Sequence, residues 1–184
     1  MVFRFIIISD EVDDFMREIQ IDSDANFLDF HKAIQKTCGY EDGQMTSFTI
    51  CENGWEKVQE ITLEDMNNDS SEDSFVMEDT KLSDFLEDEK QHLLYTFDPL
   101  ADRVFFIELA EIITRKNLAS PKVTRELGNA PQQILDFDEL MAKNPININD
   151  DIYDDDYDDD DLYGSGIDEF DLDNLDISDG NPYD

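Results

Sequence analysis

Four side chains near residue 100 could form a small chemical site. Asp98 and Asp102 flank a predicted turn, Tyr95 precedes that turn, and Glu108 lies on the next predicted strand. Two or three carboxylates that converge at a turn could bind a cation or act as an acid and base pair. The alternative is turn chemistry, because an aspartate can bond its own backbone and Pro99 fixes φ. The hairpin over residues 95–108 is therefore a candidate site for a small ligand, a metal or catalysis.

The histidines and cysteines give a weaker signal. His31, Cys38, Cys51 and His92 could in principle supply a zinc site, but their spacing matches no zinc-binding pattern. Cys38 also falls at an apolar helical position, where cysteine behaves as a small hydrophobe. The acidic run that begins at Asp150 lacks the combination of alternating ligands, central glycine and final glutamate of a calcium loop. We therefore predict no metal, no cofactor and no catalytic residue.

The segment over residues 144–184 combines dense negative charge with apolar residues. It holds 16 Asp and Glu residues and no Lys or Arg. Large apolar and aromatic side chains interrupt the acids, which is typical of a linear binding motif in a disordered segment. A solubility tail with incidental apolar residues is the alternative. The residues that we predict to bind a partner are Tyr153, Tyr157, Asp158, Asp159, Asp160, Phe170 and Leu172.

Net charge limits the classes of partner for the whole chain. The 184 residues carry 48 acidic and 13 basic side chains, which gives a formal net charge of −35. Residues 1–143 alone hold 32 acidic and 13 basic residues, so the body of the chain is acidic too. Binding to DNA phosphates and docking on an anionic membrane both depend on clustered Lys and Arg, so we expect neither. Basic protein surfaces, including those of DNA-binding proteins, are the partners that this charge favours.

One stretch runs against the overall charge. Residues 115–125 contain Arg115, Lys116, Lys122 and Arg125 and no acid. A tethered acidic tail could dock on this stretch in cis at a high effective concentration. The alternative is that these four residues only offset a strongly acidic body.

Strand and helix patterns indicate how the candidate residues are positioned. Residues 27–38 have apolar side chains at helical spacing, with cap candidates before them and Gly39 after them. Residues 81–86 suggest a second, short helix. Apolar runs and alternation predict strands over residues 2–8, 15–21, 45–51, 55–62, 92–97 and 104–109, and Asn53-Gly54 predicts a hairpin turn.

The order of these elements predicts the fold class. A β-β-α-β-β-α-β-β order favours an α+β domain with a mainly antiparallel sheet, one long helix packed on a face and ubiquitin-like elements. Residues 135–143 are spaced for a short closing helix, and dense like charge predicts disorder from residue 144 onward. The expected organisation is an α+β domain over residues 1–143 and an Asp-rich tail over residues 144–184.

The strand pair near residue 100 also resembles a known family. Residues 93–109 read Leu-Leu-Tyr-Thr-Phe-Asp-Pro-Leu-Ala-Asp-Arg-Val-Phe-Phe-Ile-Glu-Leu, and Tyr95, Phe97 and Asp98 match the first half of its Tyr-x-Tyr-Asp-Phe-Gly-Asp pattern. Residues 27–34 resemble the helix of the family, and Gly128-Asn129-Ala130-Pro131 is similar to its Pro-containing turn. The family is the Ri-plasmid ORF-three-like domain, also met as a passenger protein of insertion elements. The resemblance covers about residues 1–135.

Departures from the family pattern limit what the resemblance implies. Pro99-Leu100-Ala101 replaces the Phe-Gly of the turn, no Trp follows Asp102, and the cysteines of some relatives are missing before the Pro turn. The resemblance therefore implies a fold without a metal site, and it brings no established activity. It does imply one alternative role, an accessory protein of a bacterial mobile element.

These observations together predict a non-enzymatic protein-interaction module. The acidic tail would engage a basic protein surface, and a nucleic-acid mimic that competes for a DNA-binding protein is one form of this hypothesis. The alternative is an enzyme or ligand-binding domain that uses the hairpin carboxylates. The first residues lack the basic leader and long apolar run of a signal peptide, and the chain has only two cysteines, so we expect a cytoplasmic protein.

Overall fold

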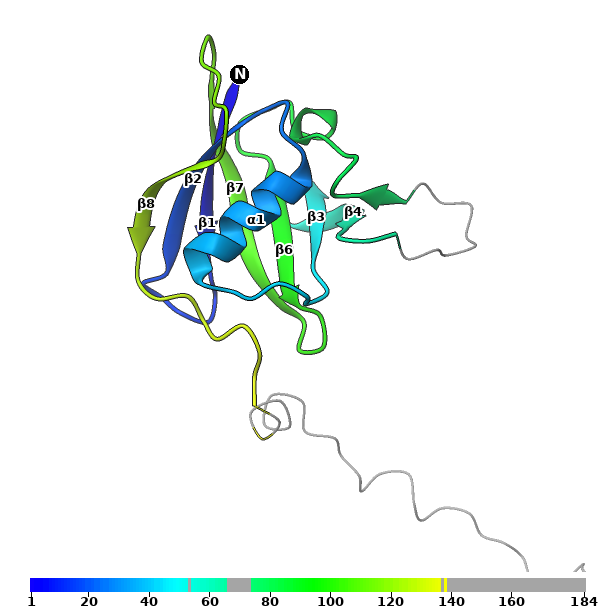
Figure 1. Ribbon diagram of the computed structural model, residues 1–184, viewed down its shortest axis with the longest axis vertical. Coiled ribbons are helices and arrows are strands. Elements are labelled where there is room, and N and C mark those ends of the chain that lie inside the picture. The colour runs from blue at the N-terminus through cyan, green and yellow to red at the C-terminus, as the bar shows by residue number, and fades with distance from the viewer. Residues whose placement is uncertain (53, 66–73, 137, 139–184) are drawn as a thin grey trace, which may run out of the picture. The chain divides into compact units, whose positions relative to one another are not determined.

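The strands of the described chain form a single sheet. A computed structural model describes residues 1–52, 54–65, 74–136 and 138, which belong to one unit, Met1–Pro145. The strands are β1 (Val2–Ile8), β2 (Met16–Asp22), β3 (Ser47–Glu52), β4 (Glu56–Thr62), β5 (Phe75–Val76), β6 (His92–Asp98), β7 (Arg103–Ile113) and β8 (Lys122–Leu127). Their order across the sheet is β5-β4-β3-β6-β7-β1-β2-β8 (Figure 1). Every pairing is antiparallel except the parallel pair of β4 and β5.

The helix α1 (Phe27–Cys38) begins and ends where the sequence predicts. The Asn26 side chain accepts a hydrogen bond of 2.9 Å from the backbone N–H of Asp29, which satisfies one of the free donors of the first turn. Gly39 ends the helix at a φ of 71°, and its N–H bonds the carbonyl of Gln35. A left-handed residue at this position favours glycine, so both caps are set by local sequence.

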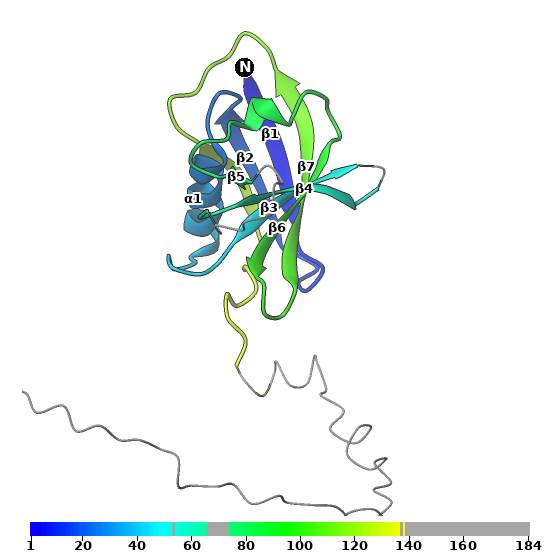
Figure 2. The same cartoon turned by 90° about the vertical axis from the view of Figure 1, so that its right-hand side faces the viewer.

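The core lies between α1 and one face of the sheet. Alternate residues of each strand point toward the helix, which follows from the two-residue period of a strand. Phe30 of α1 stacks between Phe5 of β1 and Phe48 of β3, with ring centroids 4.5 Å and 5.3 Å apart. Figure 2 shows α1 on one side of the sheet, while the adjoining ends of β3 and β4 project on the side away from it.

The predicted fold class is wrong in its helix count. The described residues contain one α-helix, and the second helix expected at residues 81–86 is a 3₁₀ turn over Leu82–Asp84. Six residues are too few to offset the cost of starting an α-helix, so tertiary bonds decide their conformation. The backbone N–H groups of Leu82 and Ser83 instead bond the carbonyls of Ala25 and Ser23. A sheet with one helix on a face still agrees with the broad α+β class.

The predicted ubiquitin-like elements are also wrong. Such a grasp places a parallel strand beside the first strand, whereas β1 lies between β2 and β7 and is antiparallel to both. Two strands were not predicted. β5 falls between predicted elements, and β8 falls largely in the basic stretch over residues 115–125.

Several predictions fall outside the described residues. The closing helix expected at residues 135–143 lies almost entirely outside them, and so do the tail over residues 144–184 and all seven of its predicted binding residues. The domain boundary at residue 143 stays a prediction. None of the helices in the described part of the chain is both long and apolar enough to cross a membrane.

Candidate functional site

Tyr95 of the predicted hairpin site is a core residue. Its side chain is fully buried on the face of the sheet that α1 covers. The hydroxyl lies 2.8 Å from Nδ1 of His31, and the ring packs against Phe48 with centroids 4.9 Å apart. A group enclosed in this way supports the packing of the helix and does not reach a ligand.

Asp98 belongs to a partly buried ion-pair cluster around the buried side chain of Arg103. Nη1 of Arg103 lies 3.4 Å from its carboxylate, and Arg103 also donates from Nε and Nη2 to Glu11 at 2.7 Å and 2.9 Å. The guanidinium lies over the ring of Phe97, 4.8 Å from its centroid. Asp98 also accepts a hydrogen bond from the backbone N–H of Ala101. These contacts fix the turn between β6 and β7 and the start of β7.

Glu108 and Asp102 lie apart from that cluster. Glu108 is on the uncovered face of the sheet, where its carboxylate lies 3.4 Å from Nε2 of His92, and the ring of His92 stacks on Trp55 at 4.3 Å. Asp102 is exposed and has a φ of 51°, a left-handed conformation that aspartate tolerates better than most residues. The structure therefore places the four predicted hairpin residues in separate surroundings and does not bring them together.

The cysteines and histidines are separate as well. Cys38 and Cys51 are free thiols, and burial raises the pKa of Cys38 to about 12. A thiol with so high a pKa stays protonated at neutral pH and is a poor nucleophile and metal ligand. Within the described ranges, no group of three or more His, Cys, Asp or Glu side chains is arranged to hold a metal ion.

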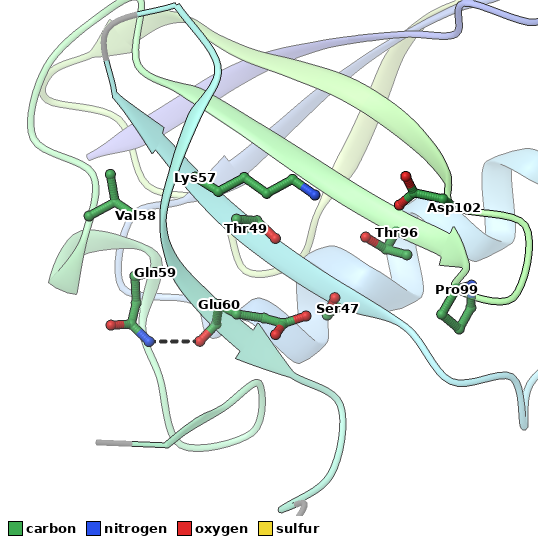
Figure 3. Close-up of a pocket in the computed structure, with 9 residues that line it drawn as sticks. All are labelled: Ser47, Thr49, Lys57, Val58, Gln59, Glu60, Thr96, Pro99 and Asp102. Carbon is green, nitrogen blue, oxygen red and sulfur yellow. Dashed lines mark hydrogen bonds between the residues drawn. The ribbon is translucent and has the colours of Figure 1, made fainter. Parts of the chain in front are cut away.

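Asp102 lines a polar pocket of about 380 Å³ (Figure 3). The floor is formed by hydroxyl side chains, Ser47 and Thr49 of β3 and Thr96 of β6. Ser47 and Thr96 are opposite each other in the register of these strands. They alternate with core residues, so the pocket lies on the face of the sheet away from α1.

The wall of the pocket comes from β4 and from the turn after β6. β4 contributes Lys57, Val58, Gln59 and Glu60, and the turn contributes Pro99 and Asp102. The registers of β3 with β4 and of β6 with β7 both shift by one residue beside the pocket. Such bulges bend a strand and redirect its side chains, and they are frequent next to binding sites.

The sequence of almost the whole chain matches a known family. The family model for "Plasmid pRiA4b ORF-3-like protein" matches residues 4–178. The chain belongs to this family. The prediction of the family from the residue 93–109 pattern is confirmed, and the match is longer than the expected range of residues 1–135. It includes most of the acid-rich segment over residues 144–184. No curated protein matches the chain.

A solved structure supports the fold of this ORF-3-like protein. It is similar to the crystal structure of protein of unknown function MM3350 from Methanosarcina mazei Go1. The two chains are 24% identical, the match covers 68% of each, and the TM-score is 0.55. At this identity the likeness shows a shared fold and carries no function.

The pocket hydroxyls of this ORF-3-like protein are free to form hydrogen bonds with a ligand. Ser47 and Thr49 are only 8% and 7% exposed, yet neither hydroxyl has a hydrogen-bond partner among the described residues. The described chain has no fully buried side-chain oxygen or nitrogen without a partner. The two hydroxyls therefore reach solvent through the pocket. The sequence gives only a faint signal for them, the alternation of hydroxyl and apolar residues in Ser47-Phe48-Thr49-Ile50.

His31 makes the stability of the ORF-3-like domain depend on pH. Burial lowers the pKa of His31 to about 4, whereas an unfolded histidine titrates near 6.5. Between these values the unfolded chain binds one more proton at this site, so the contribution of His31 is lost as pH falls. We expect the stability advantage of the native chain over His31→Gln to shrink by about 1 kcal/mol per pH unit between pH 6 and pH 4.5.

Urea unfolding of both chains across that range measures this difference. The many carboxylates titrate in both chains alike, so their effect cancels in the difference between the two free energies of unfolding. Glutamine can still bond the Tyr95 hydroxyl, so the variant isolates the charge. Parallel stability profiles for the two chains would contradict the prediction.

Proposed function

We propose that this ORF-3-like protein is a non-enzymatic interaction module whose acid-rich segment, residues 144–184, engages a basic surface of a partner protein. The composition of the segment carries the proposal, since it has 16 acidic residues and no basic residue. The carboxylates attract and orient a basic partner, and the apolar side chains between them supply contact area. The residues assigned to binding are Tyr153, Tyr157, Asp158, Asp159, Asp160, Phe170 and Leu172.

The contacts of several polar side chains in the folded domain support this proposal. Arg4 is paired with Glu18 and Glu111, so one of the few basic side chains on the uncovered face is already neutralised. Two of the hairpin groups proposed for catalysis, Tyr95 and Asp98, have structural contacts instead. The family match also runs through the acid-rich segment as far as residue 178.

The charge of the segment and the family name indicate the class of partner protein. A row of aspartates presents negative charge to a DNA-binding protein much as phosphates do, so a nucleic-acid mimic is one form of this proposal. The family name refers to a plasmid, which is consistent with an accessory protein of a mobile element that acts through a protein partner. We propose a cytoplasmic location, and the free thiols of Cys38 and Cys51 support it.

Affinity capture from native lysate tests the proposal. Four baits are compared: the full chain, a chain that ends at Lys143, a chain with the segment aspartates changed to asparagine, and one with its apolar residues changed to serine. We expect basic proteins on the full chain at about 0.1 M salt and loss of most of them at about 1 M. Charge screening acts over about 10 Å at the lower salt and about 3 Å at the higher.

The four baits separate charge from sequence. Loss on the asparagine chain alone would indicate binding by charge, and loss on both substituted chains would indicate a motif with apolar anchors. Equal capture by the full chain and by the chain that ends at Lys143 would refute the proposal.

A further inference from the structure

The pocket lined by Asp102 holds several polar groups that have no partner. Ser47 and Thr49 are more than nine-tenths buried and keep their hydroxyls free toward the pocket. The side chains of Lys57, Glu60 and Asp102 also make no hydrogen bond or ion pair with the residues that the structure describes. We infer that this pocket binds the guanidinium group of an arginine side chain presented by a partner protein.

The lining is rich in hydrogen-bond acceptors. Glu60 and Asp102 supply carboxylates, which only accept, and each pocket hydroxyl can accept as well. A ligand that fits this lining must carry many hydrogen-bond donors. The guanidinium group has five N–H donors in a planar fork and no acceptor.

Charge also favours a cationic guest. The formal net charge of −35 on the chain repels anions, and two carboxylates against one lysine leave the lining negative. Arginine suits the partly buried hydroxyl floor better than lysine, because a guanidinium is more weakly hydrated than an ammonium and costs less to desolvate.

Lys57 has a distinct role in this arrangement. Figure 3 shows its side chain extended across the pocket, with its nitrogen directed to the side where Thr96 and Asp102 lie. Lys57 is exposed and comes from the bulged part of β4, so it can swing outward when a guest enters. Its positive charge, although it pairs with neither carboxylate, repels a cationic ligand in the same pocket. Removing it should therefore strengthen the binding of arginine.

This inference goes beyond the proposed function and does not depend on it. Every lining residue belongs to the described domain, whereas the proposed function rests on residues 144–184. The pocket can bind arginine even if that segment binds nothing, and the reverse holds too.

The test is an NMR titration of the full-length chain with N-acetyl-arginine amide, read at assigned backbone amides. We expect saturable shifts at Ser47, Thr49 and Thr96. N-acetyl-lysine amide should bind more weakly, and N-acetyl-citrulline amide, which has nearly the same shape without the charge, should give no saturable shift. Shifts confined to residues 144–184, or equal shifts with the citrulline compound, would overturn the inference.

Three variants make the test specific. Asp102→Asn should weaken arginine binding about tenfold, because a charge-assisted hydrogen bond is lost while asparagine tolerates the same backbone conformation. Asp13→Asn is the matched control, since Asp13 is exposed and has no partner in the described part of the chain. It removes the same charge and should leave binding unchanged.

Lys57→Gln should strengthen binding about threefold. Equal effects of Asp102→Asn and Asp13→Asn on the affinity for arginine would show that the binding reflects only the net charge of the chain. This result would refute the pocket as the binding site. Weaker binding by Lys57→Gln would also refute the inference, because Lys57 would then hold an anionic group of the guest.

Discussion

Replacing Phe30 by alanine should lower the free energy of unfolding by about 3–5 kcal/mol. The Phe30 ring is fully buried between the rings of Phe5 and Phe48, and it connects α1 to two strands that are not neighbours in the sheet. Alanine would leave a cavity that a stiff sheet cannot close. Equilibrium unfolding in urea, followed by the fluorescence of Trp55, measures the loss.

Phe30→Leu is the matched control for this prediction. Leucine keeps an apolar group of intermediate size and loses only the ring stacking, so a clearly smaller loss is expected. A loss below about 1 kcal/mol for the alanine variant would show that the helix is not anchored through this ring.

The second large effect is expected at Arg103. Changing it to methionine should lower the free energy of unfolding by about 3 kcal/mol, because the Glu11 and Asp98 carboxylates lose their shared cation. The Arg103 side chain is only 3% exposed, so water cannot replace it fully. Methionine keeps most of the contact with Phe97, so the loss reports the polar bonds. Thermal and urea unfolding measure it.

Two further variants test the geometry of this cluster. Arg103→Lys keeps the charge but cannot bond Glu11 through two N–H groups, so it should recover only part of the stability. Glu11→Gln should cost less than Arg103→Met, since the guanidinium keeps Asp98 and the carbonyl of Gln133. Additive losses in the Arg103→Met, Glu11→Gln double variant would argue against direct coupling.

Local sequence was sufficient for the elements whose signals are local. The helix over residues 27–38 has its own caps and apolar stripe, and the strands near β1 and β7 have a strong apolar pattern. β8 was missed because it is an edge strand with mostly exposed residues and no apolar alternation. β5 was missed because two residues beside β4 are defined by their partner strand and not by any pattern of their own.

The candidate site was only partly predictable for a similar reason. Asp102 was identified from its place in a turn, and it does line the pocket. Every second residue of β6 is buried on the same face, namely Leu93, Tyr95 and Phe97. The two-residue period of a strand alone therefore places Tyr95 in the core. Ser47 lies opposite Thr96 because of the register of β3 against β6, and a single sequence does not specify that register.

The two outer strands of the sheet have a consequence for how copies of this protein behave together. Unpaired strand edges are templates for aggregation, and natural sheets protect them with short strands or with charged side chains. In the described sheet one edge is β5, which covers only two residues of β4, together with the bulged and charged first part of β4. The other edge is β8, which carries Lys122, Arg125 and Glu126 on exposed positions. Both edges are poor templates for strand addition by a second copy, even at high concentration.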